Sequence, residues 1–189
     1  SFFIRDSKFA LLNLGQLLYN SDYCKFIIDN TSFNNIVFDR NNLFSLLENN
    51  QMHISNSNFT DISSQAPGTL LYVYNNNLIS FSKVICGNIS SDDDGAIIYS
   101  IRSNNIDIKY SNFSSISSKR QGGCFNLQNT KIVISFSFFV NNSGSNGGVF
   151  YLSNSSLRMD NSIILNCSAE YFGAVIYGYN HLVFLSNGQ

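Results

Sequence analysis

The stretch Gly147-Gly148-Val149-Phe150-Tyr151-Leu152, followed by Ser162-Ile163-Ile164, decides the fold because it is repeated along the chain. Closely similar copies begin at Gly95, Gly122 and Gly173. Self-similarity at a fixed period of roughly 20 to 50 residues is typical of solenoids and other repeat architectures. The chain is therefore predicted to be a repeat protein.

A large apolar residue that follows a hydroxyl residue by two places marks each copy, and we call these apolar residues the anchors. The predicted anchors are Phe9, Phe33, Phe59, Val84, Phe113, Phe139 and Ile164, and their partners are Ser7, Thr31, Ser57, Ser82, Ser111, Ser137 and Ser162. Their spacing is nearly regular, and the longest gap separates Val84 from Phe113. We expect the anchors to form an interior stack with a hydroxyl ladder beside it.

Each copy also contains two further short apolar segments. Apolar residues alternate in the segment before the anchor, as in residues 52–54 and 132–134, and alternation predicts a half-buried strand. A second strand begins at or near glycine. Asparagine, which tolerates a left-handed backbone, separates this strand from the next pre-anchor strand in every copy. The corner residues are Asn20, Asn49, Asn50, Asn75, Asn76, Asn104, Asn105, Asn129, Asn154 and Asn180.

Three strands and three corners in about 26 residues describe one coil of a parallel β-helix. The sequence therefore predicts an all-β fold, in which residues 1–189 form a single β-helix segment of about seven coils. A leucine-rich solenoid has an overlapping period, but its spaced-leucine motif and helical turn are missing here. A sandwich or another β fold stays as the remaining alternative. Length variation falls after the anchor and predicts a row of variable loops, which include Asp92–Asp94 and Lys119-Arg120.

The composition limits the classes of partner. The chain is 44% hydrophobic and only 12% charged, with a net charge of −1, so nothing favours nucleic acid as a partner. Apolar runs are broken by Ser or Asn well short of a membrane span, so we expect no direct membrane insertion in this segment. The chain starts inside a repeat and stops before another anchor is due. We expect it to be a piece of a longer protein.

No catalytic or cofactor motif is found, so we predict no enzymatic activity, no cofactor and no metal site. The acidic residues occupy different offsets from their anchors and are not expected to stack, as paired catalytic carboxylates would require. The Asp92–Asp94 run is interpreted as a solvated loop rather than a calcium site. His53 and His181 lie more than four coils apart, and His53 is expected to point outward.

The four cysteines, at positions 24, 86, 124 and 167, have unequal offsets, so we expect buried free thiols, with a disulfide as the alternative. Sequons for N-glycosylation are plentiful in a chain this rich in Asn and Ser. The candidate sites are Asn30, Asn58, Asn88, Asn112, Asn141, Asn154 and Asn166. Asn58 and Asn112 directly precede inward anchors, so alternation turns them outward.

The Gly-Gly-x-Ile/Phe and Ser-x-Phe repeats resemble those of polymorphic outer-membrane and adhesin-type proteins of chlamydiae. They are also similar to large repeat-bearing surface proteins of ciliates and other protists, grouped with the pectin-lyase-like β-helices. The resemblance covers nearly the whole chain, although the Phe-x-x-Asn element is met at an anchor only by Phe139 and Asn142. It implies a right-handed parallel β-helix in an extracellular, structural or adhesive protein.

We expect a structural or adhesive segment of a large extracellular or cell-surface repeat protein, working as a stiff rod, stalk or filament component. Its expected partners are other protein chains, further coils of the same protein, or further copies in self-assembly. The alternative is a glycan-binding or polysaccharide-cleaving β-helix, with surface glycans as partners. A row of tyrosines after the glycine strands, at positions 72, 99, 151 and 177, would favour the alternative if it points outward. We expect instead that these rings lie at the edge of the core.

Overall fold

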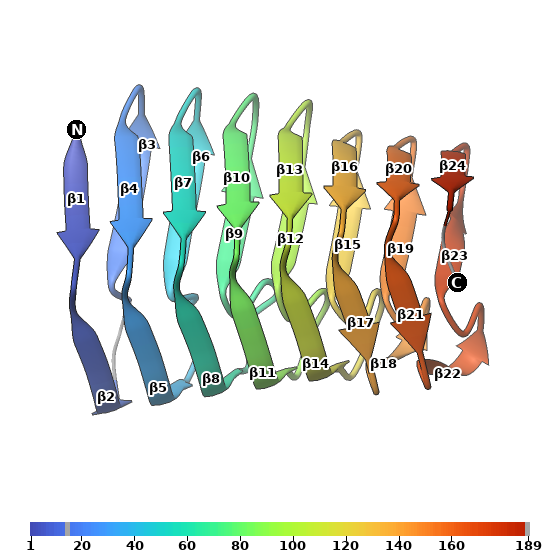
Figure 1. Ribbon diagram of the computed structural model, residues 1–189, viewed down its shortest axis with the longest axis horizontal. Helices are drawn as coiled ribbons and strands as arrows, with labels where there is room; N and C mark the ends of the chain where they lie inside the picture. Colours follow the sequence, from blue (N-terminus) through green and yellow to red (C-terminus); the bar gives the residue numbers. More distant parts are fainter. Residues whose placement is uncertain (14–15, 188–189) are drawn as a thin grey trace.

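The computed structural model describes residues 1–13 and 16–187 and shows a parallel β-helix (Figure 1). About seven turns with a period of about 26 residues stack along the long axis, as the sequence predicts. Each full coil contributes one strand to each of three sheets, called A, B and C below. Gly15, the glycine of the first copy, lies outside the described residues. Within them, no helix is long and apolar enough to cross a membrane.

Sheet A contains the strands that precede the anchors. Its order is β1 (Phe2–Arg5), β4 (Lys25–Asp29), β7 (Gln51–Ser55), β10 (Leu78–Ser82), β13 (Asn105–Lys109), β16 (Lys131–Ser135), β20 (Ser156–Asp160) and β24 (Leu182–Ser186). Every neighbouring pair is parallel. Alternation turns Met52 and Ile54 inward and His53 outward, as predicted.

Sheet B contains the anchors. Its order is β2 (Lys8–Asn13), β5 (Ser32–Phe38), β8 (Asn58–Ser64), β11 (Ile85–Ser91), β14 (Asn112–Ser118), β17 (Phe138–Val140) and β21 (Ile163–Leu165). Two short strands, β18 (Ser143–Asn146) and β22 (Ser168–Phe172), pair beside this path. A residue with positive φ interrupts the alternation within the coils of this sheet, for example Asp61 and Asn88. The chain bends there, and the next apolar residue still points inward.

Sheet C contains the strands that follow the glycines. Its order is β3 (Leu18–Asp22), β6 (Phe44–Glu48), β9 (Leu71–Tyr74), β12 (Ile98–Ile101), β15 (Phe125–Gln128), β19 (Phe150–Ser153) and β23 (Ile176–Tyr179). Gly95, Gly122 and Gly147 have positive φ where the chain turns into the sheet. A Cβ atom at Gly122 would lie 2.1 Å from the Phe125 carbonyl oxygen, which explains why these corners favour glycine.

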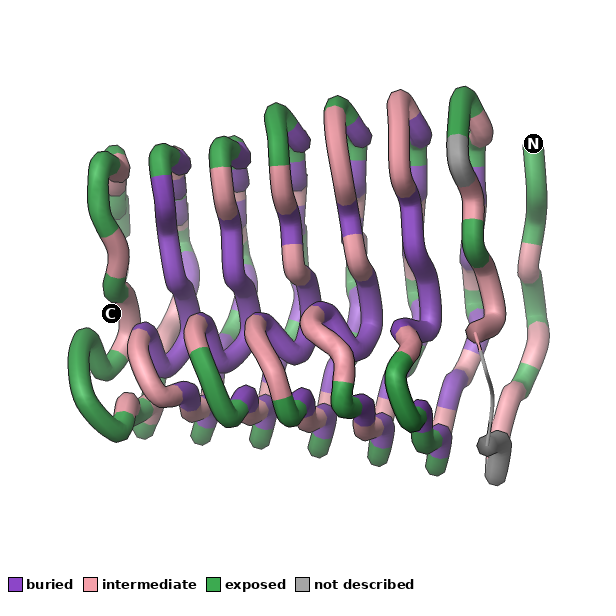
Figure 2. Tube along the Cα trace, turned by 180° about the vertical axis from the view of Figure 1, so that it is seen from behind, coloured by how far each residue is buried: buried purple, intermediate pink, exposed green. Residues whose placement is uncertain are grey.

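The core runs the length of the inner coils, whereas the first and last coils are mostly half-buried or exposed (Figure 2). Anchor rings lie parallel from coil to coil, with centroids 4.9 Å apart for Phe33 and Phe59 and 5.0 Å for Phe113 and Phe139. These spacings are close to the distance between hydrogen-bonded strands. The predicted interior stack is therefore present at both pairs.

The prediction is wrong at the fourth anchor. Cys86, not Val84, pairs in register with Phe59 and Phe113. Val84 instead takes the place of a hydroxyl residue, and its N–H donates to Ser111 Oγ at 3.2 Å. With Cys86 as the anchor, the long gap before Phe113 disappears and the spacing of the anchors becomes nearly even. The irregular gap arose because Ser82-Lys83-Val84 has the residue types of the motif but lies two residues before the position that pairs with the neighbouring anchors.

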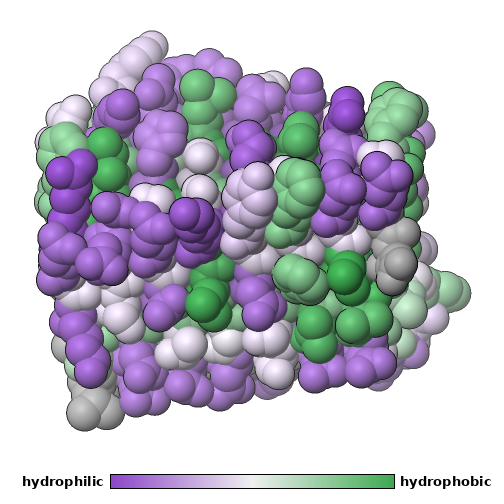
Figure 3. Space-filling model, in the orientation of Figure 1, coloured by the Kyte–Doolittle hydropathy of each residue, from purple (hydrophilic) through white to green (hydrophobic). Residues whose placement is uncertain are grey.

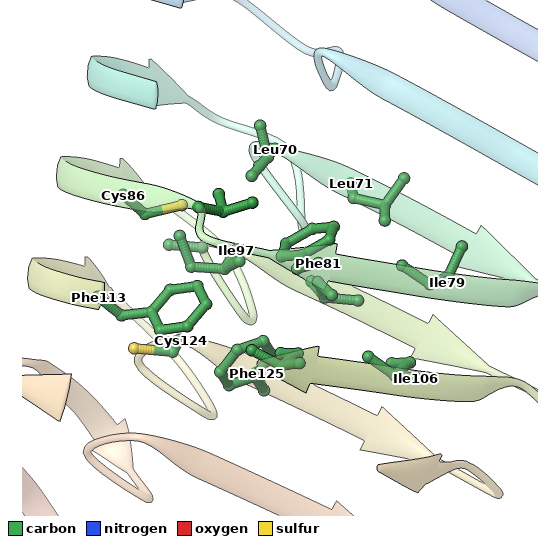
Figure 4. Close-up of a cluster of buried hydrophobic side chains, with 14 of the residues drawn as sticks. Leu70, Leu71, Ile79, Phe81, Cys86, Ile97, Ile106, Phe113, Cys124 and Phe125 are labelled. Carbon is green, nitrogen blue, oxygen red and sulfur yellow. The ribbon is translucent and has the colours of Figure 1, made fainter. Parts of the chain in front are cut away.

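In the coil that contains Phe81 and Cys86, which we call coil four, the large and the small residue lie in the opposite sheets from those of the neighbouring coils. Phe81 occupies, in sheet A, the register position that Ile54 and Ile108 hold in the neighbouring coils. In the same coil, the small side chain of Cys86 replaces the anchor ring. Phe81 and Cys86 belong to one buried cluster (Figure 4). Because protein interiors are close-packed, we expect the extra ring in sheet A to compensate for the missing ring in sheet B.

The corner between sheets A and B carries the predicted hydroxyl ladder. Its hydroxyls accept hydrogen bonds from backbone N–H groups of the preceding coil, as in Ser111 N–H to Ser137 Oγ at 3.1 Å. The same hydroxyl donates to the carbonyl two residues earlier, as in Ser137 Oγ to Ser135 O at 2.9 Å. The Ser111 N–H would otherwise be buried without its ladder partner, whereas the Ser135 carbonyl also accepts from the Tyr110 N–H at 3.1 Å. The hydroxyl therefore supplies an acceptor to the preceding coil and a second hydrogen bond to its own corner.

The corner between sheets C and A carries an amide ladder that runs inside the molecule. The Asn50 N–H donates to Asn77 Oδ1, and the Asn77 N–H donates to Asn104 Oδ1, both at 2.8 Å. These three asparagines are buried. A second, exposed pair links Asn76 Nδ2 to Asn49 Oδ1 at 2.6 Å. Amide side chains therefore join successive coils at this corner, and Asn77, the central buried residue, was not among the predicted corner residues.

The predicted loop insertion at Asp92–Asp94 is wrong. The segments after the anchors extend sheet B in register, so that Ser63, Ser90 and Ser117 pair with one another. Three consecutive coils have the same spacing from the inward anchor residue to the inward residue that follows the glycine corner. These pairs are Phe59 and Leu70, Cys86 and Ile97, and Phe113 and Cys124. Asp92–Asp94 is therefore an ordinary part of the coil and no insertion.

Candidate functional site

The outer face of sheet C carries the clearest gathering of functional side chains, and we call it the tyrosine face. Its outward residues form one register row of Tyr19, Ser45, Tyr72, Tyr99, Asn126, Tyr151 and Tyr177. A second row contains Tyr74, Ile101, Gln128, Ser153 and Tyr179. Leu71 and Val73, which alternate with Tyr72 and Tyr74, are fully buried. The tyrosines therefore point away from the core interior, but Tyr72 and Tyr99 are half-buried and Tyr151 is buried, as expected for rings at the core edge, whereas Tyr177 is exposed.

Two aromatic pairs form along this face. The rings of Tyr72 and Tyr99 stack with centroids 5.7 Å apart and planes 24° apart, and those of Tyr151 and Tyr177 lie 6.0 Å apart and tilted by 44°. Between the pairs, Asn126 is fully buried and interrupts the aromatic row. The arrangement therefore offers two separate aromatic surfaces rather than one continuous strip.

Polar groups surround the central pair. Gln128 Nε2 donates to the Tyr99 hydroxyl at 3.2 Å, and the Arg102 guanidinium lies 4.9 Å from the centre of the Tyr74 ring. A shallow hollow beside Tyr72 and Tyr74 is also lined by Asp22, Leu47 and Glu48. Aromatic faces flanked by carboxylate, amide and guanidinium groups can hold a ligand with both apolar faces and hydroxyl groups.

Partial burial changes the acid–base behaviour of the tyrosine face. Burial raises the pKa of Tyr72 and of Tyr99, and the nearby carboxylate of Asp94 adds to the effect at Tyr99. Burial also raises the pKa of Tyr151, with Tyr179 and Tyr177 adding to it. The phenols are therefore kept neutral and serve as hydrogen-bonding groups at ordinary pH.

The acidic run Asp92–Asp94 pairs with the next coil, residue by residue. Lys119 Nζ lies 2.8 Å from Asp92, Arg120 Nη1 lies 3.0 Å from Asp93, and the Gln121 N–H donates to Asp94 Oδ1 at 2.8 Å. Burial raises the pKa of Asp94, and the hydrogen bond from the Gln121 backbone N–H opposes that rise. Each carboxylate has its partner one coil later, so the run joins two coils. Sequence spacing could have shown this pairing once the length of this coil was known.

A histidine, a serine and an aspartate share one register position on the outer face of sheet A. His53, Ser80 and Asp107 lie in consecutive coils. In a catalytic triad the imidazole lies between hydroxyl and carboxylate and hydrogen-bonds both. Here Ser80 is the middle residue, so His53 and Asp107 are two strand spacings, about 10 Å, apart. Asp107 is bound by Lys109 Nζ at 2.7 Å. This order of residues does not form a triad.

The four cysteines are free thiols, as the sequence interpretation expected, but only two of them are buried, and Cys24 and Cys167 are half-buried. Cys86 and Cys124 are fully buried in the same cluster (Figure 4), and burial raises the pKa of both well above the ordinary value. Cys167 is half-buried, and its Sγ lies 3.7 Å from the Phe139 carbonyl oxygen. Neutral, buried thiols of this kind fill space as small apolar residues.

All seven sequon asparagines are exposed, and five of them lie on the outer face of sheet B. Asn58 and Asn112 occupy one register row, as alternation predicted. Asn88, Asn141 and Asn166 occupy the positive-φ positions where sheet B bends. The remaining two, Asn30 and Asn154, lie at the corners that flank sheet A. Glycan attachment itself stays a prediction.

Comparison of the chain with protein-family models, with curated proteins and with solved structures finds no match.

Proposed function

We propose that this chain is a structural or adhesive segment of a large extracellular or cell-surface repeat protein. The observation that supports the proposal is the repetition of inter-coil bonding along the stack. Three parallel sheets, the hydroxyl ladder and the amide ladder each join one coil to the next. A load along the axis acts on all of them together, so the segment resists bending and extension as a stiff rod.

The lateral surface also suits this role. Outward positions in β7, β8, β13 and β14 are mostly Ser, Asn, Lys and Asp, which favour solubility without strong charge. Strand edges in a β-helix are covered by the neighbouring coils, so backbone groups along the sides are already paired. Side chains, rather than exposed strand edges, therefore supply the specific contacts with other chains, and self-assembly into a filament would use them too.

Surface location is tested by antibody labelling of the cells that express the protein. Antibodies raised against the folded segment should label intact cells, and permeabilisation should add little signal. A cytoplasmic marker protein, which must label only after permeabilisation, controls for membrane integrity. Labelling confined to permeabilised cells would contradict the proposal.

Stiffness is tested by single-molecule extension of the segment held between two reference domains. We expect unfolding in a few large force events, because every coil depends on its neighbours. The variant Asn77→Ala, which removes the middle of the amide ladder, should lower the unfolding force. Extension at low force without discrete events would contradict the rod model.

A second candidate function is glycan binding on the tyrosine face. The observation that favours it is the outward stacked pair Tyr72 and Tyr99 with Gln128 bonded to the Tyr99 hydroxyl. Aromatic faces pack against the C–H faces of sugar rings, while neighbouring polar groups bind their hydroxyls. Affinity electrophoresis in gels that contain soluble polysaccharides tests this binding. Retardation should be lost in Tyr72→Ala. It should be kept in Tyr110→Ala, because Tyr110 lies at the corner between sheets A and B, outside the tyrosine face.

A further inference from the structure

An exposed apolar patch lies on the outer side of sheet B and the neighbouring corner. Tyr110, Phe136, Phe138, Leu165 and Ile85 define it, and each is between 45% and 57% exposed. Figure 3 shows apolar side chains gathering over β17 and β21 in this region. Exposed apolar patches of this kind on a chain of balanced charge promote association unless something covers them.

Two of these residues occupy backbone positions that do not suit them. Tyr110 and Phe136 have φ of 52° and 50°, at a corner where other coils place Asn30, Asn56 and Asn161. Bulky residues at positive φ are uncommon and carry a conformational cost. Their rings stack with centroids 5.1 Å apart and planes 10° apart, and they remain exposed. Their placement therefore points to a role outside the core.

One sequon asparagine lies inside this patch. Asn112 pairs in register with Ile85 on one side and with Phe138 on the other, and it follows Tyr110 by two residues. Its side chain is exposed, and Ser114, which completes the sequon, is on the same outward face. Neighbouring strands are about 4.8 Å apart, so a sugar on Asn112 would lie directly against all three apolar side chains.

We propose that Asn112 carries an N-linked glycan whose first sugars cover the apolar patch. A pyranose ring presents C–H groups on its faces, which pack against aromatic and aliphatic side chains, while its hydroxyls remain in water. The glycan thus replaces an exposed apolar surface with a solvated one. The inference rests on the proposed extracellular location, because attachment requires passage through a eukaryotic secretory pathway.

The attachment reaction is a transfer without oxidation or reduction. The donor is an oligosaccharide linked through pyrophosphate to a lipid. The Asn112 side-chain nitrogen forms a bond to C1 of the first sugar, and the bond from C1 to the pyrophosphate oxygen breaks. The amide nitrogen loses one proton, and the lipid pyrophosphate leaves with the bonding electrons.

The experiment uses the whole chain secreted from a eukaryotic host, followed by peptide mass mapping. Trypsin cuts after Lys109 and Lys119, so the peptide of residues 110–119 carries Asn112 as its only sequon. We expect this peptide to be glycosylated. A secreted chain in which Asn112 is unmodified while other sequons are occupied would overturn the inference and leave the proposed function standing. Because the host imposes secretion, the antibody labelling above tests native location independently.

A matched pair of variants tests whether the glycan covers the patch. Asn58 lies in the same register row, but its neighbours are Ser32 and Ile85, and Asn56 precedes it by two residues. Asn112→Gln should raise the emission of an apolar dye about twofold or more and promote self-association, whereas Asn58→Gln, whose glycan would lie against Ile85 alone, should raise the emission less and leave self-association unchanged. Equal dye emission from the two variants would overturn the proposal. So would a glycosylated wild-type chain that dimerises through the patch and becomes monomeric in Phe138→Ser.

Discussion

Val84 lies opposite Ser57 in the hydroxyl ladder and offers the Ser57 N–H no oxygen. In the coil on the other side of Ser57, the Thr31 N–H donates to Ser57 Oγ at 3.1 Å. The ladder resumes beyond the gap, where the Val84 N–H donates to Ser111 Oγ at 3.2 Å. One backbone donor thus loses its regular partner in an otherwise continuous series.

Replacing Val84 with threonine should stabilise the fold by about 1 kcal/mol, because the new hydroxyl supplies the missing acceptor for Ser57. Thr31 shows that threonine fits a ladder position. Urea unfolding followed by circular dichroism measures the change. The matched control is Val149→Thr, at a fully buried position in the apolar core, which should destabilise by about 1 to 3 kcal/mol. A loss of stability in Val84→Thr would contradict the ladder argument.

A double-mutant cycle should show whether Phe81 and Cys86 of coil four compensate for each other in size. Cys86→Phe alone overpacks the coil, and we expect a loss of about 1 to 3 kcal/mol. Phe81→Ile alone leaves a cavity and should cost a similar amount. The double variant reproduces the pattern of the neighbouring coils, so its stability should be close to wild type, with strong coupling between the sites. Additive losses would show that the two positions pack independently.

Removing the middle of the amide ladder should be costly. Asn77→Ala takes the acceptor from the Asn50 N–H and removes the Asn77 Nδ2 donors to the carbonyls of Leu47 and Tyr74. Several buried groups lose partners, so we expect a loss of about 3 kcal/mol in the free energy of unfolding. Asn76→Ala, one residue earlier and exposed, should cost about 1 kcal/mol, chiefly through its positive φ. Equal losses would contradict a special role for the buried ladder.

The tyrosine face should make stability depend on alkaline pH. Burial raises the pKa of Tyr72, Tyr99 and Tyr151 above the ordinary value of 10.0, so the folded state favours the neutral phenols. Their contribution is complete below about pH 10 and is lost as the pH rises from there through the raised folded values. Urea unfolding at a series of alkaline pH values should show this decline. The triple Tyr→Phe variant should flatten it, and Tyr23→Phe, at an 81% exposed site, should not.

The repeat in the sequence was enough to predict the coil, the anchor stack and both kinds of corner, because each follows from local side-chain chemistry. Register was harder to predict. Ser82-Lys83-Val84 satisfied the hydroxyl–apolar motif, and the pairing of Cys86 with Phe59 and Phe113 shows that Cys86 is the fourth anchor. A shift of two residues preserves the inward and outward alternation, so hydrophobic pattern alone could not detect it.

The candidate site was predicted in part. The spacing of Tyr72 and Tyr99 indicated a row of rings on one face of a sheet. Whether this row faced the core or the solvent depended on which of Leu71 and Tyr72 pointed inward, and both side chains are large. Asp92–Asp94 looked like a loop insertion because the misplaced anchor lengthened that copy. Once Cys86 replaces Val84, the same acidic run falls beside Lys119 and Arg120. The misplaced fourth anchor therefore led to two wrong interpretations of the surface. One was a loop insertion at Asp92–Asp94, and the other was an acidic run in contact with solvent rather than with the next coil.

The two internal ladders also give the rod a direction. At each corner the backbone N–H of one coil donates to a side-chain oxygen of the following coil, as in Asn50 to Asn77 and Ser111 to Ser137. The Ile116 N–H likewise donates to Asn142 Oδ1 of the following coil. A cross-section through the stack therefore leaves these ladder N–H groups on one cut surface and the side-chain oxygens that accept from them on the other, while the strand edges carry both N–H and C=O groups on each surface. The ladders are continued only when a further coil is added head to tail, so these bonds favour one orientation for any coil that joins the stack, and the two ends of the rod are chemically different.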